Sequence, residues 1–163
     1  MVEKDVEYAI KNLILSNNDE EIGITNEFQS DGIIRYKGKA IGILEFKNKK
    51  NLNNTETLGK ILCQALCYYY KLIQKEDIQY SKPFYLILGD DNEIIIMNIH
   101  QLPNNWVMNK KWGEVAPSKA GSFSDLLEFG VSALNILKPI YFKYDDIKEL
   151  KFGFHLLFSN LFN

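Results

Sequence analysis

Residues 31–47 read Asp-Gly-Ile-Ile-Arg-Tyr-Lys-Gly-Lys-Ala-Ile-Gly-Ile-Leu-Glu-Phe-Lys. This stretch predicts a β-hairpin with its turn near Gly38. Side chains alternate between the two faces of a strand, so Glu45 and Lys47 share one face of the second strand. A carboxylate and an ammonium group in such an apolar strand are costly unless they pair or bind a ligand. The stretch therefore predicts a functional site as well as a fold.

The register of the hairpin decides whether Asp31 belongs to this site. A regular turn with an even number of residues would direct Asp31 away from Glu45 and Lys47. An odd-numbered loop, or a single β-bulge, would bring Asp31 onto the same face, and Gly38 makes a left-handed loop residue inexpensive. A site built from all three residues therefore requires an odd loop or a bulge.

The segments around the hairpin predict an α/β fold. Apolar spacing indicates helices at about 3–16 and 55–75, and strands at about 22–29, 84–88 and 93–99. A strand followed by a long helix and another strand is typical of a crossover between parallel strands, so the central sheet should be mixed and flanked by helices. After this core, at about 3–100, we expect a C-terminal helical extension over about 101–163.

Composition places the chain among globular proteins of one domain. It has 163 residues, of which 46% are hydrophobic and 25% charged. No apolar run is long enough to span a bilayer, and residues 1–15 do not resemble a secretory signal, so a cytoplasmic location with no membrane contact is expected. Cys63 and Cys67 are expected to be small buried residues and not metal ligands.

The charge is distributed unevenly along the chain. Residues 1–31 carry a net charge of −6, whereas residues 35–75 hold nine basic and two acidic side chains, a net charge of +7. A basic block around the hairpin favours contact with a nucleic-acid backbone, against the alternative of a solvated lysine-rich surface. The candidates for such contacts are Arg35, Lys49, Lys50, Lys60 and Lys71.

The hairpin carries the groups that metal-dependent phosphodiester hydrolysis needs. Mg²⁺, which Mn²⁺ can replace, is held by carboxylates and other oxygens, and it stabilises charge and activates water. Asp31, Glu45 and the backbone carbonyl of Phe46 are the candidate ligands. Lys47 would hydrogen-bond the attacking water or help to deprotonate it, and it adds positive charge near the phosphate.

These residues resemble the PD-(D/E)xK nuclease superfamily, which includes restriction endonucleases and RecB-like nucleases. Asp31, thirteen further residues and Glu45-Phe46-Lys47 are similar to its motif, and the element order is similar to its αβββαβ core. Gln64-x-x-x-Tyr68 resembles the Gln-x-x-x-Tyr element of the RecB-like branch, which implies that both residues lie beside the active site. The resemblance implies a restriction-endonuclease-like fold over about residues 3–100.

The same resemblance implies further roles and leaves some of them open. Glu7 would match the first-helix acid of the RecB-like branch and could be a further metal ligand, with Glu20, Glu21 or Glu27 as alternatives. Ser30 stands where the motif has proline. A DNA-cleaving domain of this kind implies a restriction-modification or phage-defence system, with a methyltransferase, a motor or a specificity domain or subunit as partner. A homodimer is possible, and the chain could be part of a larger enzyme.

Two other interpretations stay open at this point. The chain could be a non-catalytic nucleic-acid-binding or assembly domain that keeps the nuclease fold. It could also be a structural α/β domain in which Glu45 and Lys47 have no joint role, which predicts an even hairpin loop with Asp31 turned away.

Overall fold

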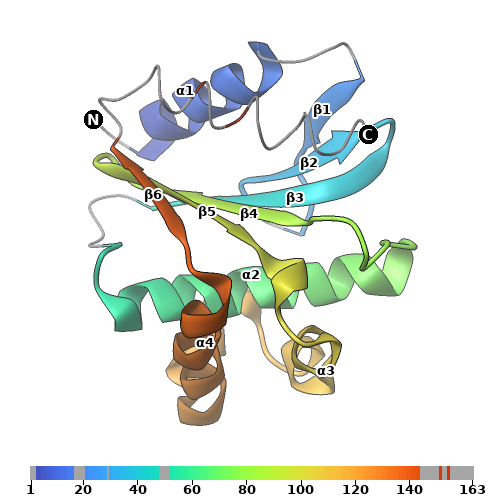
Figure 1. The fold of residues 1–163 in the computed structure, drawn as a ribbon, viewed down its shortest axis with the longest axis vertical. Helices are drawn as coiled ribbons and strands as arrows, with labels where there is room; N and C mark the ends of the chain where they lie inside the picture. Colours follow the sequence, from blue (N-terminus) through green and yellow to red (C-terminus); the bar gives the residue numbers. More distant parts are fainter. Residues whose placement is uncertain are drawn as a thin grey trace.

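The structure is a computed structural model that describes residues 3–16, 21–28, 30–47 and 52–143, together with Lys151 and Phe154. It is an α/β fold with a six-stranded sheet flanked by helices (Figure 1). The strands are β1 (Ile22–Thr25), β2 (Gly32–Tyr36), β3 (Lys39–Phe46), β4 (Tyr85–Gly89), β5 (Glu93–Asn98) and β6 (Ile140–Lys143). The helices are α1 (Glu3–Ser16), α2 (Thr55–Lys75), α3 (Asn104–Val107) and α4 (Ser124–Leu137), and short 3₁₀ turns are η1 (Ile99–Gln101), η2 (Lys110–Gly113) and η3 (Pro117–Ser122).

The sheet is mixed, as predicted. Its strands lie in sequence order from β1 to β6. Neighbouring strands are antiparallel except β3 and β4, which are parallel and are joined by the crossover helix α2. The C-terminal ends of β3 and β4 therefore lie side by side at the same end of the sheet. The Glu45-Phe46-Lys47 sequence is located at this end.

The hairpin β2–β3 contains the bulge that a shared site requires. Its turn has two residues, Lys37 and Gly38, with φ of 51° and 81°, the left-handed conformation that fits a two-residue hairpin turn. Beyond the turn Arg35 pairs with Ala40, but Ile34 pairs with Gly42, so one extra residue of β3 is accommodated between them. The expectation of an odd loop or one bulge is confirmed, and the even-loop alternative without a bulge is wrong.

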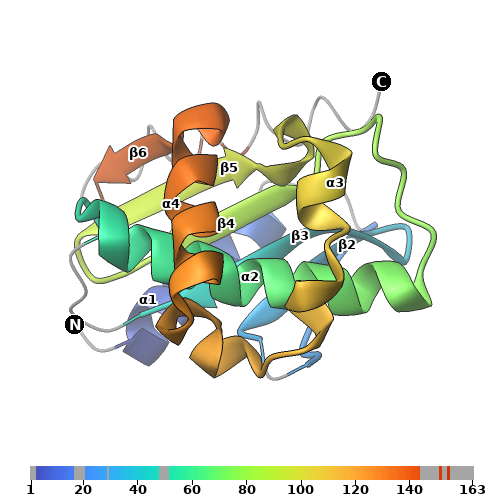
Figure 2. The same cartoon turned by 90° about the horizontal axis from the view of Figure 1, so that it is seen from below.

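Two hydrophobic cores lie on the two faces of the sheet. Helix α1 covers one face, whereas α2 covers the other, with α3 and α4 packed beyond it (Figures 1 and 2). In β3, Leu44 and Phe46 belong to the core on the α1 face, and Ile43 belongs to the core on the α2 face. Because side chains alternate, Glu45 and Lys47 follow Ile43 onto the α2 face.

Helix α2 is capped by Asn54, whose side chain accepts a hydrogen bond from the Thr57 N–H at 3.0 Å. Asn is preferred at this position because its side-chain oxygen satisfies a first-turn N–H group. The helix is 21 residues long and ends at Lys75, as predicted.

The region after residue 100 is not purely helical, which corrects the expected helical extension. Residues Ile140–Lys143 form β6, which pairs antiparallel with β5 and adds a sixth strand to the sheet. Helix α4 ends at a left-handed Lys138, and Pro139 then directs the chain back to the sheet. In the last part of the expected extension, after residue 143, Lys151 and Phe154 are helical, and the other residues lie outside the described part of the chain.

The contact between α2 and α4 depends on Gly130. A Cβ atom there would lie 2.7 Å from the Cys63 sulfur and 2.7 Å from the backbone oxygen of Gly59. We expect Gly130→Ala to lower the free energy of unfolding by about 1–3 kcal/mol, because overpacking forces two backbones apart. Urea denaturation measures this change. The matched control is Gly23→Ala, which has no atom within 4 Å of the added Cβ and should stay within about 0.5 kcal/mol of the wild type; equal effects at both positions would contradict the close-contact explanation.

Candidate active site

Asp31 and Glu45 lie opposite each other at the start of β2 and the end of β3. Gly32 pairs with Leu44, so the bulged register places Asp31 beside Glu45. The Oδ2 atom of Asp31 accepts a hydrogen bond of 2.6 Å from the backbone N–H of Phe46. The two carboxylates therefore come together from residues fourteen positions apart in the chain, through the hairpin register.

Glu45 is a buried carboxyl group with an unusual pKa. Its exposed fraction is 2%. Burial, together with the neighbouring charge of Asp31, raises its pKa to about 7, although Lys47 acts in the opposite direction. Its Oε1 atom is buried and has no hydrogen-bond partner among the described residues. A buried carboxylate oxygen without a hydrogen bond destabilises the folded protein, and a bound cation would offset this destabilisation.

Lys47 is held between Glu45 and helix α2. Its Nζ lies 3.5 Å from the Glu45 Oε2 atom and donates a 3.0 Å hydrogen bond to the Gln64 Oε1 atom. The Gln64 Nε2 in turn donates to the Tyr68 hydroxyl at 3.2 Å. Gln64 and Tyr68 thus lie one turn apart on the face of α2 that faces β3, and Gln64 is the one that contacts the lysine directly.

Tyr68 is coupled electrostatically to the two acids. The residue is 4% exposed. Burial raises the pKa of its hydroxyl, and the charges of Glu45 and Asp31 raise it further, against the hydrogen bond from Gln64. The hydroxyl therefore stays protonated at neutral pH and acts as a hydrogen-bond group.

The backbone carbonyl of Phe46 points toward the β2 side of β3. The N–H and C=O of one residue in a strand point to the same side, and the Phe46 N–H is bonded to Asp31. The next residue, Lys47, points its N–H the other way and donates to the Gly89 carbonyl at 2.8 Å. The Phe46 carbonyl oxygen is therefore on the Asp31 side of β3.

Glu7 is not brought to these residues. It forms an ion pair with Lys11 one turn further along α1, with Nζ 2.7 Å from Oε1. A Cβ built on Gly32 would lie 3.4 Å from the Lys11 side chain, so this pair lies on the α1 face of the sheet, opposite Glu45. In the described part of the chain no three His, Cys, Asp or Glu residues form a group that could hold a metal ion. Of the acids predicted for the site, Asp31 and Glu45 are the two that lie together among the described residues.

The alternatives to Glu7 are also placed elsewhere. Glu21 is exposed and lies 3.7 Å from the Lys37 ammonium, and Glu27 pairs with Arg35. Glu20 lies outside the described residues. Among the described residues, therefore, no third acid from the N-terminal segments belongs to this site.

The five candidate DNA-contacting residues have different environments. Arg35 forms ion pairs with Glu27 and Glu76 within the protein, so we assign it a structural role instead of a phosphate contact. Lys60 is exposed with a weak 3.6 Å pair to Glu56, and the ammonium of Lys71 lies 6.0 Å from the centre of the Phe28 ring. Lys49 and Lys50 lie outside the described residues.

Two buried acids in the β4–β5 turn were not singled out from the sequence. Asp90 accepts hydrogen bonds from the N–H groups of Asn92 and Glu93, which is the turn chemistry that its Gly-Asp-Asp-Asn sequence could have indicated. The Glu93 carboxylate accepts from Asn53 at 2.6 Å and from Lys143 at 2.8 Å. Glu93 thus ties the entry of α2 and strand β6 to the sheet, contacts that no local pattern reveals.

The chain matches no protein-family model, and comparisons with curated proteins and with solved structures return no match. None of the described helices has both the length and the apolarity needed to cross a membrane. The assignment of a function therefore depends on the chemistry of the site.

Proposed function

We propose that this chain is a Mg²⁺-dependent deoxyribonuclease domain with a PD-(D/E)xK-type site on a restriction-endonuclease-like core. The observation that carries the proposal is the buried Glu45 carboxyl, which lies beside Asp31, has one oxygen without a hydrogen-bond partner among the described residues, and contacts Lys47. Support also comes from the order of the elements α1, β1–β3, α2 and β4 and from the bulge that aligns the three residues.

The residues present fit a hard divalent cation. Asp31 and Glu45 supply carboxylate oxygens and Phe46 a backbone oxygen, which is the ligand chemistry that Mg²⁺ prefers. When bound, the ion would supply charge stabilisation at the phosphate and activation of water. Glu45 in its protonated form binds no cation, so at neutral pH metal binding is expected to displace a proton from this group.

Each remaining residue has a defined task in this proposal. As an ammonium, Lys47 would hold the attacking water by a hydrogen bond and stabilise the negative charge that develops on the phosphoryl oxygens. Only in its neutral form could Lys47 accept the proton of that water. Gln64 keeps the ammonium directed into the site, and Tyr68 supports Gln64. Lys60 and Lys71 would contact the DNA backbone without reading sequence. A methyltransferase, motor or specificity partner, or a homodimer, would supply the target choice.

The test is cleavage of supercoiled plasmid by the purified chain in Mg²⁺, Mn²⁺ or EDTA. We expect nicking with either metal and none with EDTA. Asp31→Asn should reduce the rate by about 10²–10³, because it weakens one ligand and leaves the fold in place. The matched control is Asp125→Asn, which should cleave like the wild type. Asp125 is an exposed acid on α4 and pairs with Lys111 of η2. Salt-sensitive DNA binding without cleavage in any metal would instead favour a non-catalytic binding domain.

A further inference from the structure

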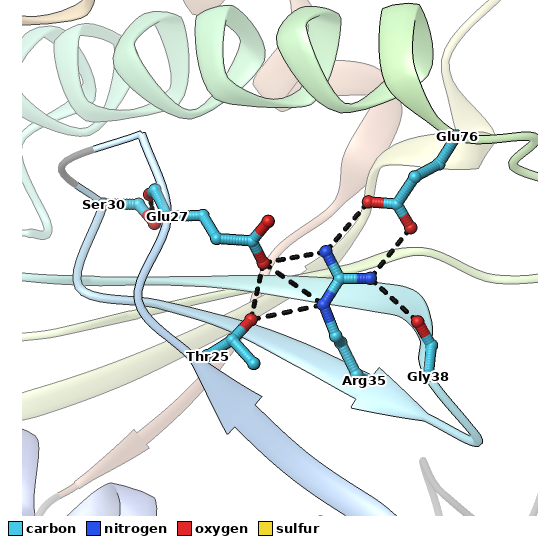
Figure 3. Close-up of polar contacts among 6 residues, drawn as sticks. All are labelled: Thr25, Glu27, Ser30, Arg35, Gly38 and Glu76. Atoms are coloured by element: carbon cyan, nitrogen blue, oxygen red, sulfur yellow. Dashed lines mark hydrogen bonds and ion pairs between the residues drawn. The ribbon is translucent and has the colours of Figure 1, made fainter.

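Arg35 is the centre of an ion-pair network at the opposite end of α2 from the N-cap (Figure 3). Its guanidinium donates to both oxygens of Glu76, at 2.8 Å each, and to Glu27 Oε2 at 2.7 Å. It also donates to the Gly38 carbonyl at 2.9 Å. The Arg35 side chain is 16% exposed, and these bonds raise its pKa, with Glu76 the larger contributor. All five N–H donors of Arg are suited to such a fixed, planar arrangement.

The network holds three segments that are distant in sequence. Glu27 follows β1, Gly38 forms the β2–β3 turn, and Glu76 follows the last residue of α2. Figure 3 shows the guanidinium between Glu27 and Thr25 on one side and Glu76 on the other. Arg35 itself is in β2. Its side chain therefore connects the β2–β3 hairpin both to the loop after β1 and to the end of the crossover helix α2.

One arm of the network leads directly to Asp31. Hydrogen bonds from Thr25 and Arg35 lower the pKa of Glu27 and hold its carboxylate. The Glu27 backbone carbonyl accepts from both the N–H and the hydroxyl of Ser30, at 3.0 and 2.7 Å. This closes a tight turn in which Phe28 has a φ of 58°, a conformation that a non-glycine residue keeps only when neighbours enforce it. Asp31 is the residue that leaves this turn.

The other arm leads to Lys47. Glu76 anchors the end of α2, and Gln64 lies twelve residues earlier, which is roughly 18 Å along a helix. Because a helix is rigid along its axis, fixing its end also fixes the position of Gln64 beside the Lys47 ammonium. Asp31 and Lys47 reach the site through separate elements, and Arg35 is connected to both.

We infer that Arg35, with Glu27 and Glu76, is a positioning residue of the active site, which sets the Asp31 carboxylate against the Phe46 N–H and thereby prepares the site for its metal ion. This inference rests on the proposed function for its catalytic consequence, but the position of Asp31 can be measured without catalysis. The Phe46 amide reports on Asp31, and the neighbouring Lys47 amide, bonded to Gly89, reports on the strand pairing alone.

The experiment measures amide hydrogen exchange by NMR in the metal-free wild type and in Arg35→Gln. We expect the Phe46 amide to exchange about tenfold faster in Arg35→Gln, since a charge-assisted hydrogen bond is lost, with little change at Lys47. Gly130→Ala is the control for general destabilisation, because it weakens the α2–α4 contact and should accelerate both amides alike. Unchanged Phe46 exchange, or equal acceleration of both amides in Arg35→Gln, would overturn the inference.

The same variants separate this inference from the proposed function. In Arg35→Gln the Mg²⁺ concentration for half-maximal cleavage should rise about tenfold, with the rate at saturating Mg²⁺ reduced less than about threefold. Arg35→Lys, which keeps the charge but loses the two-oxygen contact with Glu76, should fall between the wild type and Arg35→Gln. If the wild type does not cleave DNA, the proposed function fails, and the exchange at Phe46 still decides whether Arg35 positions Asp31.

Discussion

Glu45→Gln is expected to abolish Mg²⁺-dependent cleavage and, at the same time, to make the metal-free protein more stable at pH 8. The pKa of Glu45 is raised from 4.5 to about 7 by burial and by Asp31. Between these two values the folded state holds a proton that the unfolded state has released, so the stability of the wild type falls as pH rises from about 4.5 to 7. Glutamine has no proton to lose and keeps the stability that the wild type has at low pH.

The free energy of unfolding of Glu45→Gln should exceed that of the wild type by an amount that grows by roughly 2–3 kcal/mol from pH 5 to pH 8. This increase is the free energy that corresponds to the raised pKa of the nearly fully buried Glu45 over this pH interval. Urea denaturation in EDTA at the two pH values measures it. Glu56→Gln is the matched control, because Glu56 is exposed on the first turn of α2 and should show no such difference. A Glu45→Gln protein that is less stable than the wild type at pH 8 would contradict the assigned pKa.

This prediction has a consequence for Mg²⁺ binding. Saturating Mg²⁺ should raise the melting temperature of the wild type at pH 8 and leave that of Glu45→Gln unchanged, because a ligand stabilises only the state that binds it. Stability and function would then conflict at one residue, as is common at active sites. A similar increase in both proteins would place the metal elsewhere.

Lys47→Met is expected to reduce the rate of cleavage by about 10²–10⁴ at saturating Mg²⁺, the usual range for loss of a group that handles a proton. Methionine keeps the length of the side chain and removes the donor to Gln64 and the charge beside Glu45. Loss of that charge should also raise the pKa of Glu45 above 7, since Lys47 lowers it in the wild type. Mg²⁺ binding by the variant should therefore be weak at pH 7 and recover at pH 9.

Single-turnover cleavage at pH 9, together with the shift in melting temperature caused by Mg²⁺, separates these two effects. Lys75→Met is the control, because this substitution also removes one positive charge, but at a position away from Glu45. Lys75 lies on α2, over the Phe28 ring. If Lys47→Met at pH 9 binds Mg²⁺ and cleaves at the rate of the wild type, Lys47 has no part in the chemistry. If both lysine variants lose activity equally, the effect is one of general charge.

Much of the fold could be predicted from local sequence patterns. The extents of α1 and α2 and the existence of the first five strands follow from apolar spacing, and the mixed sheet follows from the long helix between β3 and β4. The pairing of Lys47 with Glu45 was expected from strand alternation alone. The position of Gln64 beside the site was implied only by the resemblance to the RecB-like branch, because its contact with Lys47 joins a helix to a strand. Strand β6 was missed, since its four residues pair with β5 across more than forty positions of the chain.

Local sequence patterns identify the groups that could form the site, whereas long-range pairing and packing select those that come together. Asp31 joins Glu45 because of one bulge, and the residues at 31–47 allow a register with or without it. Arg35 belongs to the basic block by composition, yet Glu76 and Glu27 neutralise it from segments 41 and 8 residues away. Glu7 has helical spacing suited to a site but lies on the other face of the sheet. The physical reason is the same in each case: spacing along the chain restricts the face on which a side chain lies, and only long-range pairing and packing decide what that face meets.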